Sequence, residues 1–227
     1  MVIALITCAV SLADIEVGGT VVPTDKFLVF LFLGNSNMGG RNGGSDHTTH
    51  PRLWNYKLDD ATNPSVVNQW IPAESPIHKD ASWQSGEGPA MLFGKKMVEK
   101  YPEHYIGIIQ NAHTSCSCDG KGENYHKGTS LYSEIVGAAQ ANMGKGTFAG
   151  VLTNLGLIDR HTPDGFGDCM KQLITDIRAD LGEPRMCYLV GQYEKGATGK
   201  FDPDGNSGAR SIIEQVEALP SQVDKCA

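Results

Sequence analysis

Runs of apolar residues alternate along the chain with segments of helix length. Three of the runs predict buried strands, at residues 27–33, 105–109 and 148–153. The first of them, FLVFLFL, is apolar at every position, which is typical of a strand in a parallel sheet that is covered on both faces. We therefore expect residues 27–33 at the centre of the sheet, with the other two runs beside them. Shorter strands are predicted at residues 53–56 and 186–190.

Helices are predicted between and after these strands. They cover residues 90–100, 131–143, 166–181 and 212–219, and a polar loop is expected at residues 196–208. Strands that are separated by helices of this length favour right-handed crossovers and a parallel sheet. The predicted fold is α/β, a three-layer α/β/α sandwich with a central parallel sheet.

The loops after the strands are the candidate site, because ligands of such sheets bind beyond the carboxyl ends of the strands. The loop after residues 27–33 reads GNSNMGGR, and it places Ser36 where the hydroxyl and the N–H of this residue can face a substrate. The loop is not a G-x-S-x-G elbow, because Met38 stands at the second glycine. Ser36 is therefore either a nucleophile or the cap of a following helix, which is a common use of serine.

Four sequence blocks carry a resemblance to a known family. The loop GNSNMGGR resembles the G-Q-S-N-M-x-G-R block of the SGNH hydrolases, in their sialate O-acetylesterase-like, carbohydrate esterase family 6 branch. Residues 85–95, SGEGPAMLFGK, are similar to the second block of this acetylxylan esterase-like branch. Residues 109–115 resemble its third block, and residues 125–136 resemble the segment between the third and fourth blocks. The resemblance extends from about residue 27 to residue 219 and implies the flavodoxin-like SGNH sandwich.

The resemblance implies a serine esterase that needs no cofactor and removes acetyl groups from an acetylated polysaccharide such as xylan. Ser36 would attack the acetyl carbonyl and form an acyl-enzyme that water hydrolyses. The oxyanion would be bound by the backbone N–H groups of Ser36 and Gly88 and by the side-chain amide of Asn111. The other interpretation of Asn111 is a structural amide that holds its loop.

Two departures from the family pattern concern the catalytic machinery. The fourth block, usually G-V-L-W-x-Q-G-E-x-D, reads GVLTNLGLID at residues 150–159, so Leu155 and Leu157 replace the polar Gln and Glu. Asn154 is a candidate substitute amide. Asp159 matches the last Asp of the block, or it is a solvated helix cap.

The second departure concerns the general base. The family carries it in an Asp-x-x-His motif near its C-terminus, and the last histidine here is His161. We expect the chain to end before its base and to hydrolyse acetyl esters very weakly or not at all. His113 is a candidate substitute base or a substrate contact.

Two other functions remain open. One is a non-catalytic or truncated relative that binds acetylated carbohydrate without turnover. The other is a flavodoxin-like binding domain, which has no phosphate loop to support it.

Composition limits the partners. With 40% apolar residues the chain can form a sizeable core, and a net charge of −7 argues against nucleic acid as a partner. No apolar stretch is long enough to span a membrane.

The start of the chain is distinguished from the rest. Residues 1–20 are expected to be a leader or N-terminal extension and residues 21–227 the esterase domain. A leader predicts a secreted or periplasmic protein, whereas a buried first strand is compatible with the cytoplasm.

Cysteines and aromatic residues leave further expectations. Six cysteines are too few for a disulfide scaffold and show no zinc spacing, so most are expected to be small buried residues and no metal site is expected. Aromatic residues near the first two blocks either pack in the core or stack on a sugar; they are Trp54, Trp70, Trp83 and Tyr56.

Overall fold

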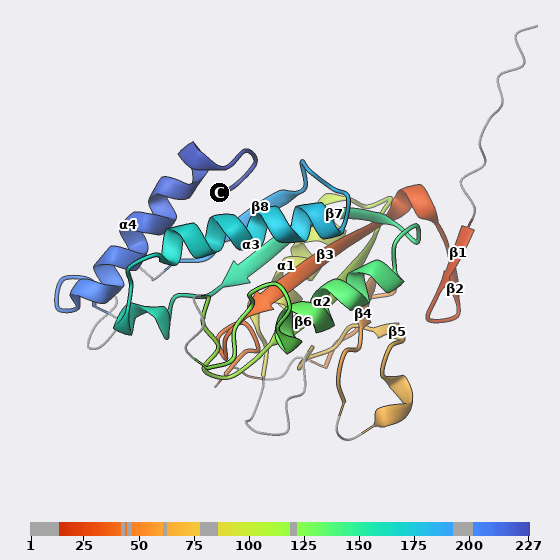
Figure 1. The fold of residues 1–227 in the computed structure, drawn as a ribbon. Coiled ribbons are helices and arrows are strands. Elements are labelled where there is room, and N and C mark those ends of the chain that lie inside the picture. Colours follow the sequence, from red (N-terminus) through yellow and green to blue (C-terminus); the bar gives the residue numbers. More distant parts are fainter. Residues whose placement is uncertain are drawn as a thin grey trace, which may run out of the picture.

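A six-stranded sheet forms the centre of the protein (Figure 1). The computed structural model describes residues 14–41, 44, 47–60, 63–77, 86–118, 122–192 and 202–227. The strand order is β5-β4-β6-β3-β7-β8, and all neighbours pair in parallel except β5, which is antiparallel to β4. The strands are β3 (Phe27–Gly34), β4 (Leu53–Tyr56), β5 (Trp70–Pro72), β6 (Tyr105–Ala112), β7 (Thr147–Asn154) and β8 (Cys187–Val190). The predicted α/β sandwich is confirmed.

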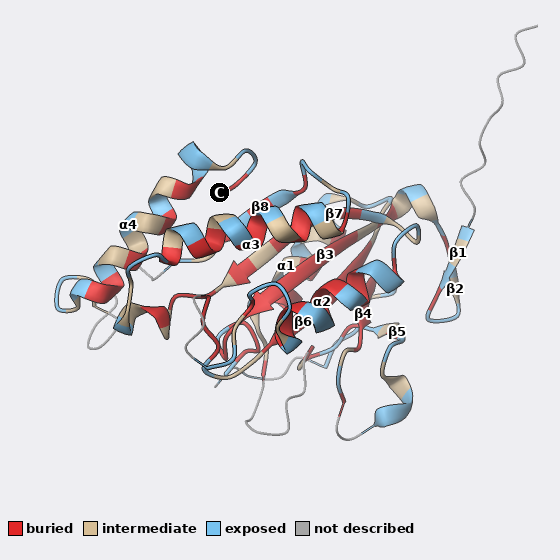
Figure 2. Ribbon diagram, viewed as in Figure 1, coloured by how far each residue is buried: buried red, intermediate tan, exposed pale blue. Residues whose placement is uncertain are grey.

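The most apolar strand lies where its sequence predicted. β3 pairs with β6 over its whole length, from Phe27 opposite Tyr105 to Gly34 opposite Ala112. Its other edge pairs with β7. Figure 2 shows these three strands as largely buried. A strand with neighbours on both edges and helices on both faces has no solvated side, and this explains why every position of FLVFLFL is apolar.

Four helices cover the two faces of the sheet. They are α1 (Pro89–Lys100), α2 (Ser130–Ala141), α3 (Phe166–Asp180) and α4 (Ser207–Gln222). Buried side chains of α2, α3 and α4 share one core cluster, whereas Ala90 and Met91 of α1 pack with Phe30 and Phe32 in a second cluster. α2 and α3 therefore lie on one face and α1 on the other (Figure 1).

The two ends of the chain add short strand pairings. β1 (Asp14–Val17) and β2 (Thr20–Pro23) form an antiparallel hairpin that was not predicted, with Val17 and Val22 fully buried. At the other end Cys226 pairs in parallel with Tyr188 beside β8, and the N–H of Ala227 donates to the carbonyl of Tyr188 at 2.9 Å. The expected leader falls largely on residues 1–13, which lie outside the described residues. Among the helices the structure describes, none is long and apolar enough to cross a bilayer.

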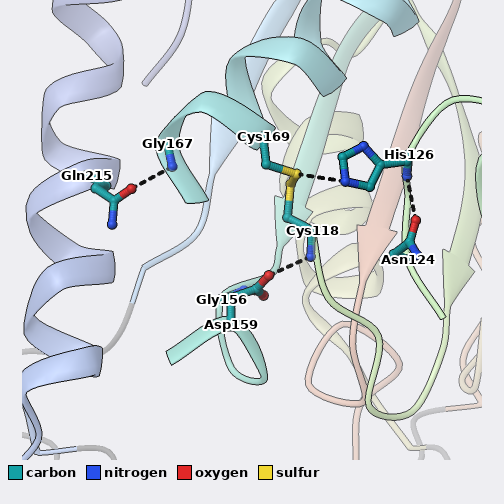
Figure 3. Close-up of a disulfide and its surroundings, with 8 residues drawn as sticks. All are labelled: Cys118, Asn124, His126, Gly156, Asp159, Gly167, Cys169 and Gln215. Atoms are coloured by element: carbon teal, nitrogen blue, oxygen red, sulfur yellow. Dashed lines mark hydrogen bonds between the residues drawn. A yellow bond between two sulfur atoms is a disulfide. The ribbon is translucent and has the colours of Figure 1, made fainter. Parts of the chain in front are cut away.

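One disulfide of the structure was not predicted. Cys118, in the loop after β6, is bonded to Cys169 of α3 (Figure 3). Cys116 and Cys226 are buried free thiols, as expected, and Cys187 is an exposed one. The pairing was missed because the two half-cystines are separated by 51 residues and no spacing pattern connects them.

Candidate active site

Ser36 lies in a tight turn directly after the central strand. The N–H of Met38 donates to the carbonyl of Asn35 at 3.0 Å, and the N–H of Arg41 donates to the carbonyl of Ser36 at 2.9 Å. The side-chain oxygen of Asn35 accepts the N–H of Asn37 at 2.9 Å. Ser36 itself is buried, with 4% of its surface exposed. A serine in a turn held by its own backbone is positioned rigidly at the carboxyl edge of the sheet.

Backbone contact brings Gly88 to this turn. The N–H of Gly86 donates to the carbonyl of Gly40 at 2.9 Å. A Cβ atom at Gly88 would lie 2.3 Å from the carbonyl oxygen of Met38, so only glycine permits this approach. Gly88 is also the residue before α1, and the N–H groups at such a helix start have no partner within the helix. The first and second sequence blocks therefore meet in space.

Asn111 is turned toward α2. Its side-chain nitrogen donates to the carbonyl of Leu131 at 3.3 Å and to Glu134 Oε2 at 3.1 Å. These two contacts use both amide hydrogens of a residue that is 2% exposed. This geometry corresponds to the structural amide. To donate to an oxyanion, the side chain of Asn111 would have to give up at least one of these two bonds.

His113 lies beside the Ser36 turn and next to a carboxylate. Its N–H donates to the carbonyl of Gly34 at 2.9 Å, and its Nδ1 is 2.5 Å from Glu123 Oε2. Nδ1 is also 3.1 Å from the carbonyl oxygen of Thr114. An imidazole oriented through Nδ1 by a carboxylate exchanges protons at Nε2, as in serine hydrolase triads. The role of Glu123 was not predicted, because ten residues separate it from His113.

The fourth block supports the same edge of the sheet. The carbonyl of Asn154 accepts the N–H of Asn35 at 3.1 Å, which joins β7 to the serine turn. Asp159 is not the solvated cap considered above, because it is 1% exposed. Its Oδ1 accepts the N–H of Cys118 at 2.7 Å and its Oδ2 accepts the N–H of Gly156 at 3.0 Å (Figure 3). Asp159 therefore joins the fourth block to the disulfide loop.

Tyr125 is a supporting residue that sequence reasoning did not single out. Its hydroxyl lies 2.9 Å from the carbonyl oxygen of Asn111 and 3.3 Å from that of Gly34, and it accepts the N–H of Gly34 at 3.4 Å. Burial raises the pKa of the Tyr125 hydroxyl well above its usual value, so the group remains a neutral donor. It connects the carboxyl ends of β3 and β6 directly before Ser36.

The aromatic residues divide between core and cavity. Trp54 and Trp70 belong to the core, and the indole N–H of Trp70 donates to Asn142 Oδ1 at 2.8 Å. Trp83 lies outside the described residues. Tyr56 is 6% exposed and lines a cavity of about 760 Å³ that also contains Asn111 and His113.

No group of three or more His, Cys, Asp and Glu side chains in the described part of the chain could hold a metal ion. The candidate site brings together a serine turn, the neighbouring backbone at Gly88 and a histidine–carboxylate pair, at the carboxyl edge of a mostly parallel sheet. A serine turn at the carboxyl end of the central strand of such a sheet is typical of the SGNH class of hydrolases.

Comparison with known proteins identifies the family. A family model described as carbohydrate esterase, sialic acid-specific acetylesterase, matches residues 26–223, and the chain belongs to this family. A probable carbohydrate esterase of Arabidopsis thaliana is 27% identical over 175 residues, which cover 70% of this chain and 65% of that protein, less than two thirds of its length.

Solved structures share the fold. The X-ray structure of the Arabidopsis thaliana protein superimposes with a TM-score of 0.70 at 20% identity, over 88% of this chain and 83% of that one. The crystal structure of NanS gives a TM-score of 0.66 at 18% identity, over 86% of this chain and 74% of that one.

Proposed function

We propose that this protein is a carbohydrate O-acetylesterase in which Ser36 is the nucleophile. The observation that carries the proposal is the contact between the Ser36 turn and the Gly88 backbone, since it brings a serine close to the N–H groups at the start of α1, which have no partner within the helix. Family membership supports ester hydrolysis on carbohydrate. A structural neighbour with a TM-score of 0.58, from Xanthomonas citri, is described as a carbohydrate acetylesterase.

The proposed reaction has two steps. Ser36 Oγ attacks the acetyl carbonyl carbon while its proton passes to a base, and the N–H groups of Ser36 and Gly88 bind the oxyanion. The sugar hydroxyl leaves with a proton, and water then hydrolyses the acetyl-enzyme and releases acetate. We assign the base to His113 Nε2, because Glu123 occupies the Nδ1 side of the ring. The substrate class is an acetylated plant or bacterial polysaccharide such as xylan.

A binding protein without turnover is the second candidate. In the described part of the chain, no side chain forms a hydrogen bond with the Ser36 hydroxyl. Leu155, where the family pattern has Gln, is buried in the core. Such a protein would retain the site and bind acetylated carbohydrate.

We also propose that the protein is secreted or periplasmic. The bond between Cys118 and Cys169 supports it, because disulfides persist in oxidising compartments.

Acetate release from acetylated xylan and from p-nitrophenyl acetate tests the proposal. The missing Asp-x-x-His motif predicted little or no turnover, whereas the pairing of His113 with Glu123 favours a substitute base. We therefore expect turnover that falls by about 10³-fold or more in Ser36→Ala and by about 10²-fold or more in His113→Gln. Ser133→Ala, at an exposed position of α2, is the matched control and should keep full activity. Turnover that survives in Ser36→Ala would overturn the nucleophile assignment. Binding of acetylated xylo-oligosaccharide without turnover in the unmutated chain would establish the binding protein instead.

A further inference from the structure

The cavity of about 760 Å³ runs beside α2 and not over the serine turn. One wall follows α2, since both Ser130 at its start and Ala141 at its end line the cavity. Eleven residue steps of an α-helix span about 17 Å, which is longer than a single sugar ring. The opposite wall includes Tyr56, Leu58 and Asn68, from the end of β4 and the segment after it. We call this elongated cavity the α2 groove.

The α2 groove leads to the reactive serine. His113 lines it, and the backbone N–H of His113 is bonded to the carbonyl of Gly34, two residues before Ser36. The start of α2 also lies at this edge, because a helix that follows a parallel strand runs back from its carboxyl end. A chain that presents an acetyl group to Ser36 would therefore continue along α2.

The lining of the groove has both polar and apolar parts. Leu58, Ala138 and Ala141 offer apolar surface to the C–H faces of sugar rings. Asp59, Glu123 and Glu134 contribute carboxylates, which accept hydrogen bonds from hydroxyl groups. Among the described lining residues there is no Lys or Arg. Glu123 is paired with His113. Asp59 and Glu134 have no Lys or Arg beside them among the described lining residues, and their negative charges oppose the binding of a carboxylated ligand.

We propose that the α2 groove binds an uncharged glycan chain attached to the acetylated sugar, and that its acidic side chains select against glycans that carry carboxylates. This inference rests on the proposed function for the position of the acetyl group. The proposed selectivity differs from the sialic acid specificity that the family's description names, because a sialic acid carries a carboxylate. The groove would select glycans by their length and charge, and the Ser36 turn would carry out ester hydrolysis.

Gly137 offers a way to block the groove. It is exposed on α2 and lines the groove, and a Cβ atom there would meet nothing within 4 Å. A leucine side chain would extend from this unobstructed Cβ position into the groove, and leucine is a better helix former than glycine, so the fold should persist. Ser133→Leu is the matched control, because Ser133 is an exposed residue of the same helix that does not line the groove.

Titration calorimetry with unacetylated oligosaccharides tests the inference without any turnover. We expect xylohexaose or cellohexaose to bind the unmutated chain, Gly137→Leu to weaken this binding at least tenfold, and Ser133→Leu to leave it unchanged. A galacturonic acid hexamer should bind at least tenfold more weakly than the neutral hexamers. That difference should shrink in the double variant Asp59→Asn/Glu134→Gln and at high salt.

The outcomes that overturn the inference differ from those that overturn the esterase. The inference is wrong if neither neutral hexamer binds, if Gly137→Leu binds as tightly as the unmutated chain, or if the galacturonic acid hexamer binds equally well. None of these results depends on an ester bond. Failure of acetate release would remove the esterase proposal, and hexamer binding blocked by Gly137→Leu would still support the groove.

Discussion

Gly88 determines how closely two backbone segments approach at the site. A Cβ atom on Gly88 would collide with the carbonyl oxygen of Met38, and Gly40, with a φ of +84°, lies against the backbone of residues 86–88 in the same contact. The nearest atoms at Gly88 and Gly40 are backbone atoms, so a side chain at either position would have to displace the main chain. The serine turn therefore depends on glycines that carry no chemistry of their own.

Gly88→Ala should impair catalysis more than folding. A Cβ atom 2.3 Å from the Met38 oxygen forces the two segments apart, at a cost of about 1–3 kcal/mol in the free energy of unfolding. Acetate release should fall by about 10²-fold, because an oxyanion donor moves. Gly205→Ala, at an exposed turn outside the α2 groove, is the control, since a Cβ atom there would come no closer than 3.4 Å to its nearest neighbour. Urea unfolding and acetate release measure the two effects, and unchanged turnover in Gly88→Ala would contradict the oxyanion assignment.

Tyr125→Phe tests whether the Tyr125 hydroxyl stabilises the backbone directly before the Ser36 turn. The substitution leaves the carbonyl of Asn111 without its 2.9 Å hydroxyl partner, and it should lower the free energy of unfolding by about 1–3 kcal/mol. Tyr101→Phe, a change at a partly exposed tyrosine after α1, should cost less. Equal unfolding midpoints in urea for the two variants would show that the Tyr125 hydroxyl contributes no stability.

At the scale of elements, the strands and helices whose burial follows from their own sequence were predictable. β3, β6 and β7 are long apolar runs, and α1 carries Pro89 in its first turn. The start of α4 was placed too late because Gly208 was interpreted as part of a loop. In the structure Gly208 lies inside α4, where a Cβ atom would be 1.9 Å from the Arg160 carbonyl oxygen. This glycine permits close packing between elements, which no local pattern reveals.

The disulfide should contribute substantially to stability. In the chain-entropy treatment, closing a loop of 51 residues is worth about 4 kcal/mol. The double variant Cys118→Ser/Cys169→Ser should therefore unfold at a markedly lower urea concentration. Cys187→Ser, at an exposed free thiol, is the control and should change little. A double variant as stable as the unmutated chain would show that the Asp159 contacts alone hold this loop.

At the scale of the whole molecule, buried thiol and phenol groups predict a loss of stability in alkali. Burial raises the pKa of Cys116 from 9.0 to about 12, so the folded chain keeps a proton that the unfolded chain releases. Stability should fall as the pH rises above about 9 and until it passes about 12, with a slope of about 1.4 kcal/mol per pH unit for this one group. Cys116→Ala should reduce that slope in urea titrations, and an unchanged slope would contradict the assignment.

Some features of the candidate site follow from the local sequence, and others depend on contacts between distant segments. Ser36 and Gly88 could be predicted because each lies in a short block with its own pattern. The Glu123 carboxylate on His113, the bonds of Asn111 to α2 and the α2 groove arise only when distant segments fold together. The net charge of −7 argued only against nucleic acid as a partner, and it could not locate the carboxylates that line the groove.

The central claim, that the Ser36 turn forms an esterase nucleophile, is tested most directly by covalent labelling. The unmutated chain is incubated with a fluorophosphonate, and the modified residue is located by peptide mass spectrometry. We predict a single adduct on Ser36, slowed in His113→Gln because proton removal activates the serine. Absence of the adduct, or its formation on another residue while Ser36 stays unmodified, would contradict this account.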